Sequence, residues 1–302
     1  MKTKLLFFNI IFLLIVTQCL FAGQMDVLKA KNFTVSYDPP LRFAAQEVAD
    51  MYPRIKADLE HIFGWQLNLK PSVVLIRDRR QFQRMAESPL TVAFAVPTRN
   101  LIVIDHSRMS TNPFNLGVVL KHELCHLLLH HHIRASTLPR WLDEGIAQWS
   151  SDGIADIVMD QKRSRLNRVS FRNGLIRLHT LEKRFPADTP SLSLAYEESK
   201  SFVTYMIGKF GKQRVLTVLT YMRQGENVDS AILKALSIPL EELEKKWHHS
   251  LRQKITWFTY ISYHLYEILF AAGALITIYA FIRLIIRKRA YMKGEEDSRF
   301  YS

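Results

Sequence analysis

The sequence predicts an α+β domain followed by one membrane-spanning helix. Two observations support this prediction. Segments that read as strands occur only before Asn112, whereas helical periodicity dominates the chain after Pro113. Strands first and helices second are typical of the α+β class. The other observation is a long, almost wholly apolar segment from Leu265 to Ile286.

The first part of the domain, residues 31–132, is expected to form a small mixed or antiparallel sheet with helices. The predicted strands are residues 33–37, 72–76, 91–96 and 101–105, the last two as a hairpin. Apolar residues at three- and four-residue steps predict a helix from Ala44 to Ile62, which Pro53 kinks and Gly64 ends. A further helical turn or two is expected at residues 81–86.

The second part of the domain, residues 133–254, reads as helices only. A helix from Leu116 to about His130 leads into it. Glycines and prolines separate the helices expected after it, which are residues 139–149, a series within 164–181, 195–210, 214–223, 227–236 and 240–254.

The two ends of the chain predict its location. Residues 1–22 have a short basic start, an apolar stretch and a small residue at the end, the layout of a secretory signal peptide. Retention as an uncleaved anchor is the alternative. Residues 257–286 form the predicted transmembrane helix with an aromatic outer flank, and 287–302 a basic tail. Because basic residues stay on the cytoplasmic side, residues 23–254 are predicted to be periplasmic or extracellular and the tail cytoplasmic.

Composition excludes several classes of protein. With 48% hydrophobic and 23% charged residues, the chain is not generally disordered. Its two cysteines, Cys19 and Cys125, cannot form a disulfide framework. The net charge is +13, and many basic residues lie between Lys162 and Arg184. Stacking aromatics are not interleaved with them, so we interpret them as a solvated basic face and expect no nucleic-acid partner.

One motif predicts chemistry. His122-Glu123-Leu124-Cys125-His126 is an H-E-x-x-H sequence inside an apolar helix. Residues four apart lie on one helix face, so both imidazoles can bind one zinc ion. Glu123 is rotated away from them and is expected to act as general base. Burying these three side chains would be costly without such a role.

A catalytic zinc ion needs a third protein ligand. His132 has the spacing of the metzincin ligand, but Leu129 stands where that motif has its turning glycine, so the helix should continue and His132 should point away. Glu144, at the start of the next helix and followed by Gly145, is the favoured candidate. Asp143 and Gln148 are candidates to hold the imidazole N–H groups.

These blocks, with Ala195-Tyr196-Glu-Glu-Ser and the closing Leu240-Glu-Glu-Leu-Glu-Lys-Lys-Trp247, resemble the peptidase MA-like domains of the gluzincin class. The resemblance implies a compact thermolysin-like fold over residues 23–254. It also implies one zinc ion held by His122, His126 and Glu144, Glu123 as catalytic base, and Tyr196 as a catalytic hydrogen-bond donor.

The implied function is a membrane-anchored zinc metalloprotease. It would hydrolyse peptide bonds of peptides or proteins through a water molecule that the metal activates, with the lipid bilayer as a second partner. A catalytically silent metal-binding module and a metallohydrolase of non-peptide bonds are the alternatives. The sequence does not predict the substrate or whether cleavage is internal or terminal.

Overall fold

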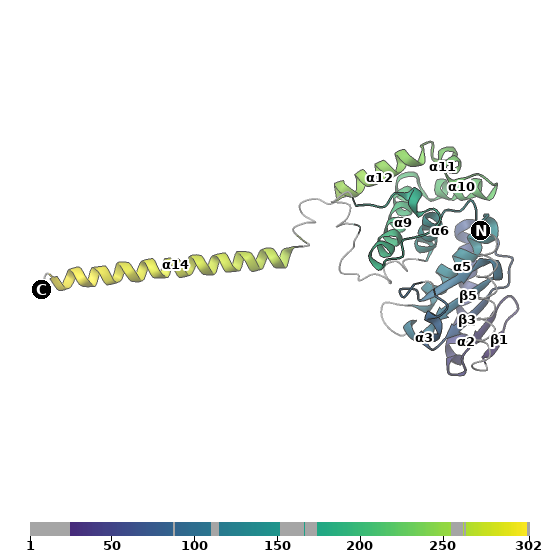
Figure 1. The fold of residues 1–302 in the computed structure, drawn as a ribbon, viewed down its shortest axis with the longest axis horizontal. Coiled ribbons are helices and arrows are strands. Elements are labelled where there is room, and N and C mark those ends of the chain that lie inside the picture. The colour runs from purple at the N-terminus through teal and green to yellow at the C-terminus, as the bar shows by residue number, and fades with distance from the viewer. Residues whose placement is uncertain are drawn as a thin grey trace. The chain divides into compact units, whose positions relative to one another are not determined.

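The computed structural model describes residues 25–86, 88–109, 115–151, 166, 174–254, 262 and 264–300 (Figure 1). The chain divides into two compact units, Met1–His248 and His249–Ser302. The predicted signal peptide and Cys19 lie outside the described residues, as do the basic residues from Lys162 to Arg172 and most of the aromatic flank.

The first unit begins with a five-stranded mixed sheet. Its strands are β1 (Asp26–Lys29), β2 (Thr34–Tyr37), β3 (Ser72–Ile76), β4 (Ala93–Val96) and β5 (Leu101–Asp105), in the order β1-β2-β3-β5-β4. The inner pairs β2·β3 and β3·β5 are parallel, and the outer pairs β1·β2 and β4·β5 are antiparallel. The central strands are rich in Val and Ile, as expected for strands that are covered on both faces.

The sheet confirms the four predicted strands, including the β4–β5 hairpin around η2 (Pro97–Arg99), and adds β1. Helix α2 (Arg42–Phe63) follows β2 and ends at Gly64, whose φ of 68° suits a glycine. It continues through Pro53, which is exposed, so water can reach the carbonyl group that this proline leaves without a partner. Short helices α3 (Arg79–Gln83) and α4 (His106–Met109) follow β3 and β5.

Helix α5 (Leu116–His132) packs against α2, against β4 and against the next helix, α6 (Arg140–Ser150) (Figure 1). The side chain of Asn115 caps its start by accepting from the backbone N–H groups of Gly117 and Val118. Eleven residues of this helix are buried, because its apolar side chains face packed elements on nearly every side. Helix α5 therefore connects the sheet with the helical half.

The helical half contains η3 (Leu178–Leu181), α9 (Thr189–Phe210), α10 (Lys212–Arg223), α11 (Val228–Leu236) and α12 (Leu240–Lys254). The predicted helices at 195–210, 214–223, 227–236 and 240–254 are confirmed, and α9 starts earlier because Asp188 caps it. The helical series expected within 164–181 is wrong for residues 174–177, which are irregular, and most of its remainder lies outside the described residues.

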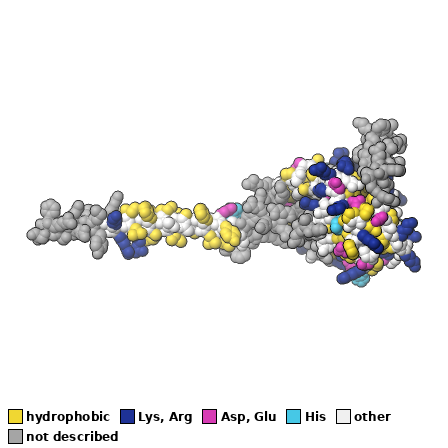
Figure 2. All heavy atoms as spheres, turned by 90° about the horizontal axis from the view of Figure 1, so that it is seen from below, with side chains coloured by type: hydrophobic (Ala, Val, Ile, Leu, Met, Phe, Trp, Pro, Cys, Tyr) yellow, Lys and Arg dark blue, Asp and Glu magenta, His cyan; other side chains and the backbone are white. Residues whose placement is uncertain are grey.

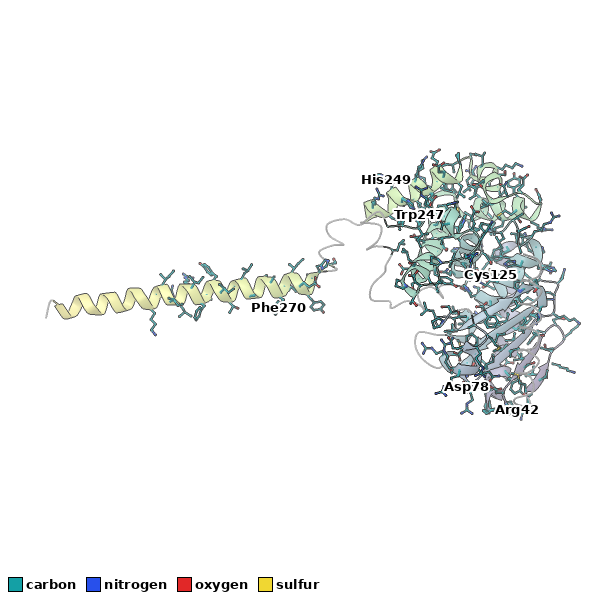
Figure 3. All side chains as sticks on the ribbon, viewed as in Figure 1. Arg42, Asp78, Cys125, Trp247, His249 and Phe270 are labelled. Carbon is teal, nitrogen blue, oxygen red and sulfur yellow. The ribbon has the colours of Figure 1, made fainter. Side chains whose placement is uncertain are left out.

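Helix α14 (Leu265–Phe300) belongs to the second unit and continues through the predicted basic tail. Its segment Leu265–Lys288 is long and apolar enough to cross a membrane, and none of its most apolar window is buried. Hydrophobic side chains cover its described surface, and Lys and Arg follow at one end (Figure 2). Phe270, for example, projects from the helix and is 81% exposed (Figure 3).

Candidate metal centre

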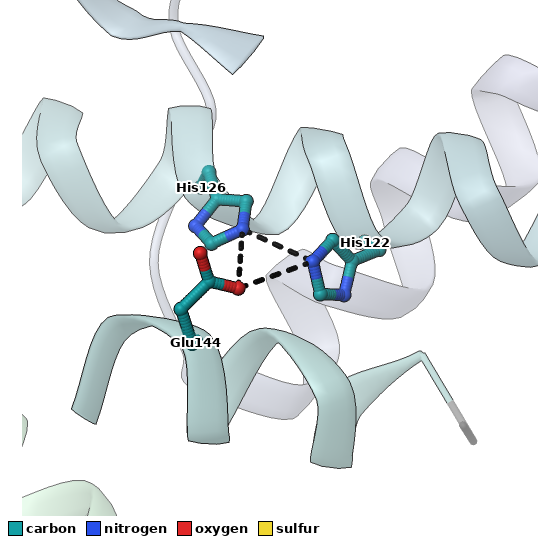
Figure 4. Close-up of side chains that lie close together, drawn as sticks. All are labelled: His122, His126 and Glu144. Atoms are coloured by element: carbon teal, nitrogen blue, oxygen red, sulfur yellow. Dashed lines mark hydrogen bonds and ion pairs between the residues drawn. The ribbon is translucent and has the colours of Figure 1, made fainter. Parts of the chain in front are cut away.

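Helices α5 and α6 bring three of the predicted site residues together (Figure 4). His122 and His126, one turn apart on α5, point their Nε2 atoms at the same place, 3.1 Å from each other. Oε2 of Glu144, from α6, lies 3.6 Å from each of these nitrogens. All three side chains are buried, with 5%, 8% and 7% of their residues' surface exposed.

This triangle fits a zinc ion. Zinc bound tetrahedrally at about 2.0–2.2 Å separates its ligand atoms by about 3.3 Å, which lies between the separations of 3.1 and 3.6 Å found here. In the plane of the three atoms, the point equidistant from all of them lies about 2.0 Å from each, within the range of zinc–ligand bonds. Two imidazole nitrogens and a carboxylate oxygen are also donors that zinc prefers.

Asp143 holds the imidazole of His126 on the side opposite its metal-facing Nε2 atom. Its Oδ1 lies 2.8 Å from Nδ1 of His126, and its Oδ2 lies 2.9 Å from Nε2 of His130. Burial opposes ionisation of Asp143, but the charge of His126 and the hydrogen bonds from both imidazoles lower the pKa of its carboxyl to about 2. An anionic Asp143 accepts the Nδ1–H of His126 and leaves the Nε2 lone pair for the metal.

The charges around the triangle favour a cation. Burial disfavours the imidazolium form of His126, but the negative charges of Asp143 and Glu144 outweigh it and raise the pKa of His126 well above its usual value. Burial likewise opposes ionisation of Glu144, yet the charges of His126 and His122 lower the pKa of its carboxyl. The same negative potential that holds a proton here would hold a divalent ion.

Glu123 lies next to the two histidines on α5 and is 5% exposed. Burial raises the pKa of its carboxyl, the charges of His122 and His126 lower it, and the nearby carboxylates of Glu144 and Asp143 raise it again, with a net upward shift. A carboxyl group with a raised pKa is a stronger base than an ordinary surface glutamate, as a proton-transfer role requires.

Tyr196, on α9, lies beside the same centre. Burial raises the pKa of its hydroxyl, and the negative charges of Glu144 and Glu123 add to the rise, which the positive charge of Arg140 opposes. The ring of Tyr196 meets the ring of Phe185 edge to face, with centroids 5.1 Å apart. The hydroxyl therefore remains protonated and able to donate at neutral pH.

Other residues singled out in the sequence lie elsewhere. His132 ends α5, and its Nε2 lies 2.9 Å from the carbonyl oxygen of Gln66, so it points away from the triangle as predicted. Gln148 is buried, but its amide has no hydrogen-bond partner among the described residues, so the expected bond to an imidazole is not formed. Cys125 is a buried free thiol whose pKa is raised to about 12 by burial, which fits the predicted packing role (Figure 3).

Two contributors are not among the predicted site residues. His130 follows His126 by the same four residues that separate His126 from His122. That repeat places all three on one face. Arg140 precedes Glu144 by four residues and lies near its carboxylate, with Nη2 3.8 Å from Oε1. Both four-residue spacings are visible in the sequence, but the side chains that His130 and Arg140 contact depend on how the helices pack.

Replacing Asp143 by Ala is expected to weaken zinc binding about 10- to 100-fold, because His126 loses the carboxylate that fixes its ring and tautomer. Competition with a chromophoric chelator measures this affinity. Asp229→Ala, which removes an exposed carboxylate from α11, is the matched control and should bind zinc as the wild type does. Equal affinities for the two variants would contradict the supporting role of Asp143.

Gly145 sets the separation between α6 and α9. A Cβ atom there would lie 2.5 Å from the carbonyl oxygen of Ser199 and 2.7 Å from Cγ2 of Val203. Gly145→Ala should therefore destabilise the domain by about 1–3 kcal/mol through overpacking, although alanine favours helices. Chemical denaturation measures the effect, with Gly208→Ala as control because that position is open. A more stable Gly145→Ala domain would show that the contact is not tight.

The sequence profile of the Peptidase MA superfamily matches residues 76–253, more than half of the 302-residue chain. The chain belongs to the Peptidase MA superfamily. The match begins at the end of β3 and includes α5, α6 and α9, so this Peptidase MA protein has all five predicted site residues within the matched region.

Comparison with curated proteins found no match. Among solved structures, the M1 zinc metallopeptidase of Deinococcus radiodurans is 15% identical, over 76% of this chain and 50% of that one, with a TM-score of 0.46. Legionella pneumophila aminopeptidase A in complex with aspartic acid is 15% identical, over 74% and 27%, with a TM-score of 0.43.

Yeast LTA4 hydrolase in complex with bestatin is 13% identical, over 78% of this chain and 39% of that one, with a TM-score of 0.44. This chain spans about half the length of the Deinococcus enzyme and less of the other two. Since every TM-score quoted is below 0.5, membership of the Peptidase MA superfamily rests on the sequence profile.

Proposed function

We propose that this Peptidase MA protein is a membrane-anchored zinc metallopeptidase with one zinc ion per chain. The observation that supports it most strongly is the triangle of Nε2 of His122, Nε2 of His126 and Oε2 of Glu144, whose dimensions suit zinc. We also propose the compact thermolysin-like fold implied by the sequence resemblance for residues 23–254.

The proposed reaction is hydrolysis of a peptide bond. Bound zinc would act as a Lewis acid and lower the pKa of a coordinated water molecule towards about 7. Glu123 takes the proton of the attacking water and passes it to the leaving amine, a role that its buried position and raised pKa support. Tyr196 donates its hydroxyl hydrogen to the carbonyl oxygen as negative charge develops there.

The outer strand beside α5 supports a peptide as the substrate. β4 is the last strand of the sheet and pairs only with β5 among the described strands. It also contacts α5, the helix that carries His122 and His126. A peptide in extended conformation can add to such an edge through backbone hydrogen bonds. This mode of binding would bring its carbonyl groups to the side of the sheet where α5 lies.

The apolar helix α14 supports the proposed anchor. We propose that residues 1–22 are a signal peptide, 23–254 the extracytoplasmic catalytic domain, 257–286 the transmembrane helix with its aromatic outer flank, and 287–302 a cytoplasmic tail. The exposed apolar surface of Leu265–Lys288 would face lipid. The lysines at the start of the chain and the basic cluster after Ile286 favour this orientation.

The test is zinc content and peptide hydrolysis by the full chain in detergent micelles. We expect one zinc ion per chain, cleavage of a fluorogenic peptide library, loss of cleavage after chelation, and recovery when zinc is restored. Stoichiometric zinc without peptide cleavage would favour the silent metal-binding module or a non-peptide substrate. A chain that binds no zinc would contradict the proposal altogether.

A further inference from the structure

Arg140 lies between two residues of the proposed site. It is the first residue of α6 and precedes Glu144 by one helical turn, so both side chains lie on the same face. Its Nη2 atom forms an ion pair with Oε1 of Glu144 at 3.8 Å. Its guanidinium also lies over the ring of Phe185, which Tyr196 of α9 meets edge to face. Arg140 is thereby next to both a proposed ligand and a proposed hydrogen-bond donor.

The position of Arg140 is unfavourable for a cation on local grounds. The start of a helix carries partial positive charge, which repels a basic side chain. The guanidinium instead lies over the face of Phe185, with Cζ 5.3 Å from the ring centroid. The backbone N–H of Arg140 donates to the carbonyl oxygen of Glu182, at 2.8 Å. Both partners belong to the segment before α9, and these contacts hold Arg140 in place.

The two oxygens of Glu144 face different partners. Oε2 faces the Nε2 atoms of both histidines, and Oε1 faces Arg140. Attraction to the guanidinium keeps Oε1 away from the ion, so the carboxylate offers the metal a single oxygen. A second oxygen from Glu144 would occupy a coordination position that a catalytic site must leave open for water.

The charge of Arg140 lies close to Tyr196, because both side chains contact the ring of Phe185. A guanidinium has only donors, so it cannot accept the hydroxyl hydrogen of Tyr196. That hydrogen can therefore be donated to another acceptor. A neighbouring cation also favours a hydroxyl group that shares its hydrogen with a developing anion.

We propose that Arg140 is a positioning residue: it restricts Glu144 to one ligand oxygen and, from its place over Phe185, keeps a positive charge beside the hydroxyl that Tyr196 offers to the substrate carbonyl. This inference rests on the proposed function. It predicts two separate consequences of losing the guanidinium, a change in metal coordination and a slower chemical step. Neither is expected if Arg140 only supports the packing of α6 against Phe185.

The test compares Arg140→Met with Arg140→Lys in the full chain in detergent. Methionine keeps an apolar stem against Phe185 and removes the charge, whereas lysine keeps the charge but loses the planar fork. Arg184→Met is the matched control, because Arg184 is an exposed arginine beside Phe185 in sequence. Each protein is loaded with Co²⁺ for visible absorption spectra and with zinc for peptide kinetics.

We expect the intense visible absorption of four-coordinate Co²⁺ in the wild type and in Arg184→Met, and weaker absorption in Arg140→Met as the second oxygen of Glu144 joins the ion. For the zinc proteins we expect kcat of Arg140→Met to fall about 10- to 100-fold with little change in KM. Arg140→Lys should restore part of kcat. If Arg140→Met does not fold, the fall in kcat of Arg140→Lys relative to Arg184→Met decides the question.

Two results overturn the proposal in different ways. A wild type that binds Co²⁺ and cleaves peptide, with Arg140 variants of unchanged spectrum and kcat, would exclude the positioning role and leave the proposed function intact. A wild type that neither binds Co²⁺ nor cleaves peptide would overturn the proposed function and this inference with it.

Discussion

Glu123→Gln is expected to lower kcat/KM for peptide hydrolysis by about 10²- to 10⁴-fold, the usual contribution of a general base. Glutamine has nearly the same shape as glutamate but cannot take up a proton from water. Zinc content should stay at one ion per chain, because Glu123 is not a member of the ligand triangle formed by His122, His126 and Glu144. Fluorogenic peptide kinetics and atomic absorption measure the two quantities.

The matched control for this experiment is Glu241→Gln, which makes the same substitution at an exposed glutamate of α12. It should cleave peptide at the wild-type rate. Undiminished hydrolysis by Glu123→Gln would exclude this residue as the base, and loss of zinc from this variant would mean that Glu123 belongs to the metal ligands.

Glu144→Ala is expected to lower zinc affinity by more than about 100-fold, beyond the range typical for loss of a supporting partner, and to abolish hydrolysis with it. Alanine removes the only carboxylate oxygen of the triangle and leaves two histidines, too few for a catalytic zinc site. Chelator competition measures the affinity of the purified chain, and circular dichroism shows whether the variant folds.

His132→Ala is the control for the ligand assignment. His132 contacts the carbonyl oxygen of Gln66 and the ring of Trp65, both in the loop that follows α2. The zinc affinity of the His132→Ala variant should match that of the wild type. If His132→Ala loses zinc and Glu144→Ala keeps it, the third ligand is the histidine and α5 must bend or unwind to bring it to the ion.

Much of the fold follows from local sequence patterns. The short apolar runs at 72–76 and 101–105 and the Asn115 cap of α5 need no knowledge of their partners. β1 could not be predicted in this way, because only four residues pair with β2 and their side chains are mostly exposed. Such a strand forms because the edge of β2 offers backbone groups to pair with, and its own sequence shows little apolar alternation.

The candidate site was likewise predictable only in part. His122, Glu123 and His126 follow from spacing within one helix, and Glu144 from a nearby block that resembles a known family. The network around them depends on how α5, α6 and α9 meet. Asp143 reaches two imidazoles of α5 at once, and Arg140 and Tyr196 contact the same ring, that of Phe185. Periodicity within one segment does not specify these distances.

The position of β4 at the edge of the sheet also carries a risk of self-association. A terminal strand whose backbone groups lack a neighbour can pair with another copy of the same chain and start aggregation. β4 is short, only four residues, and Pro97 follows it at once, so few consecutive N–H groups are available for such pairing. An edge this short can receive a few residues of a passing polypeptide while giving a second copy of the protein too little length for a lasting sheet.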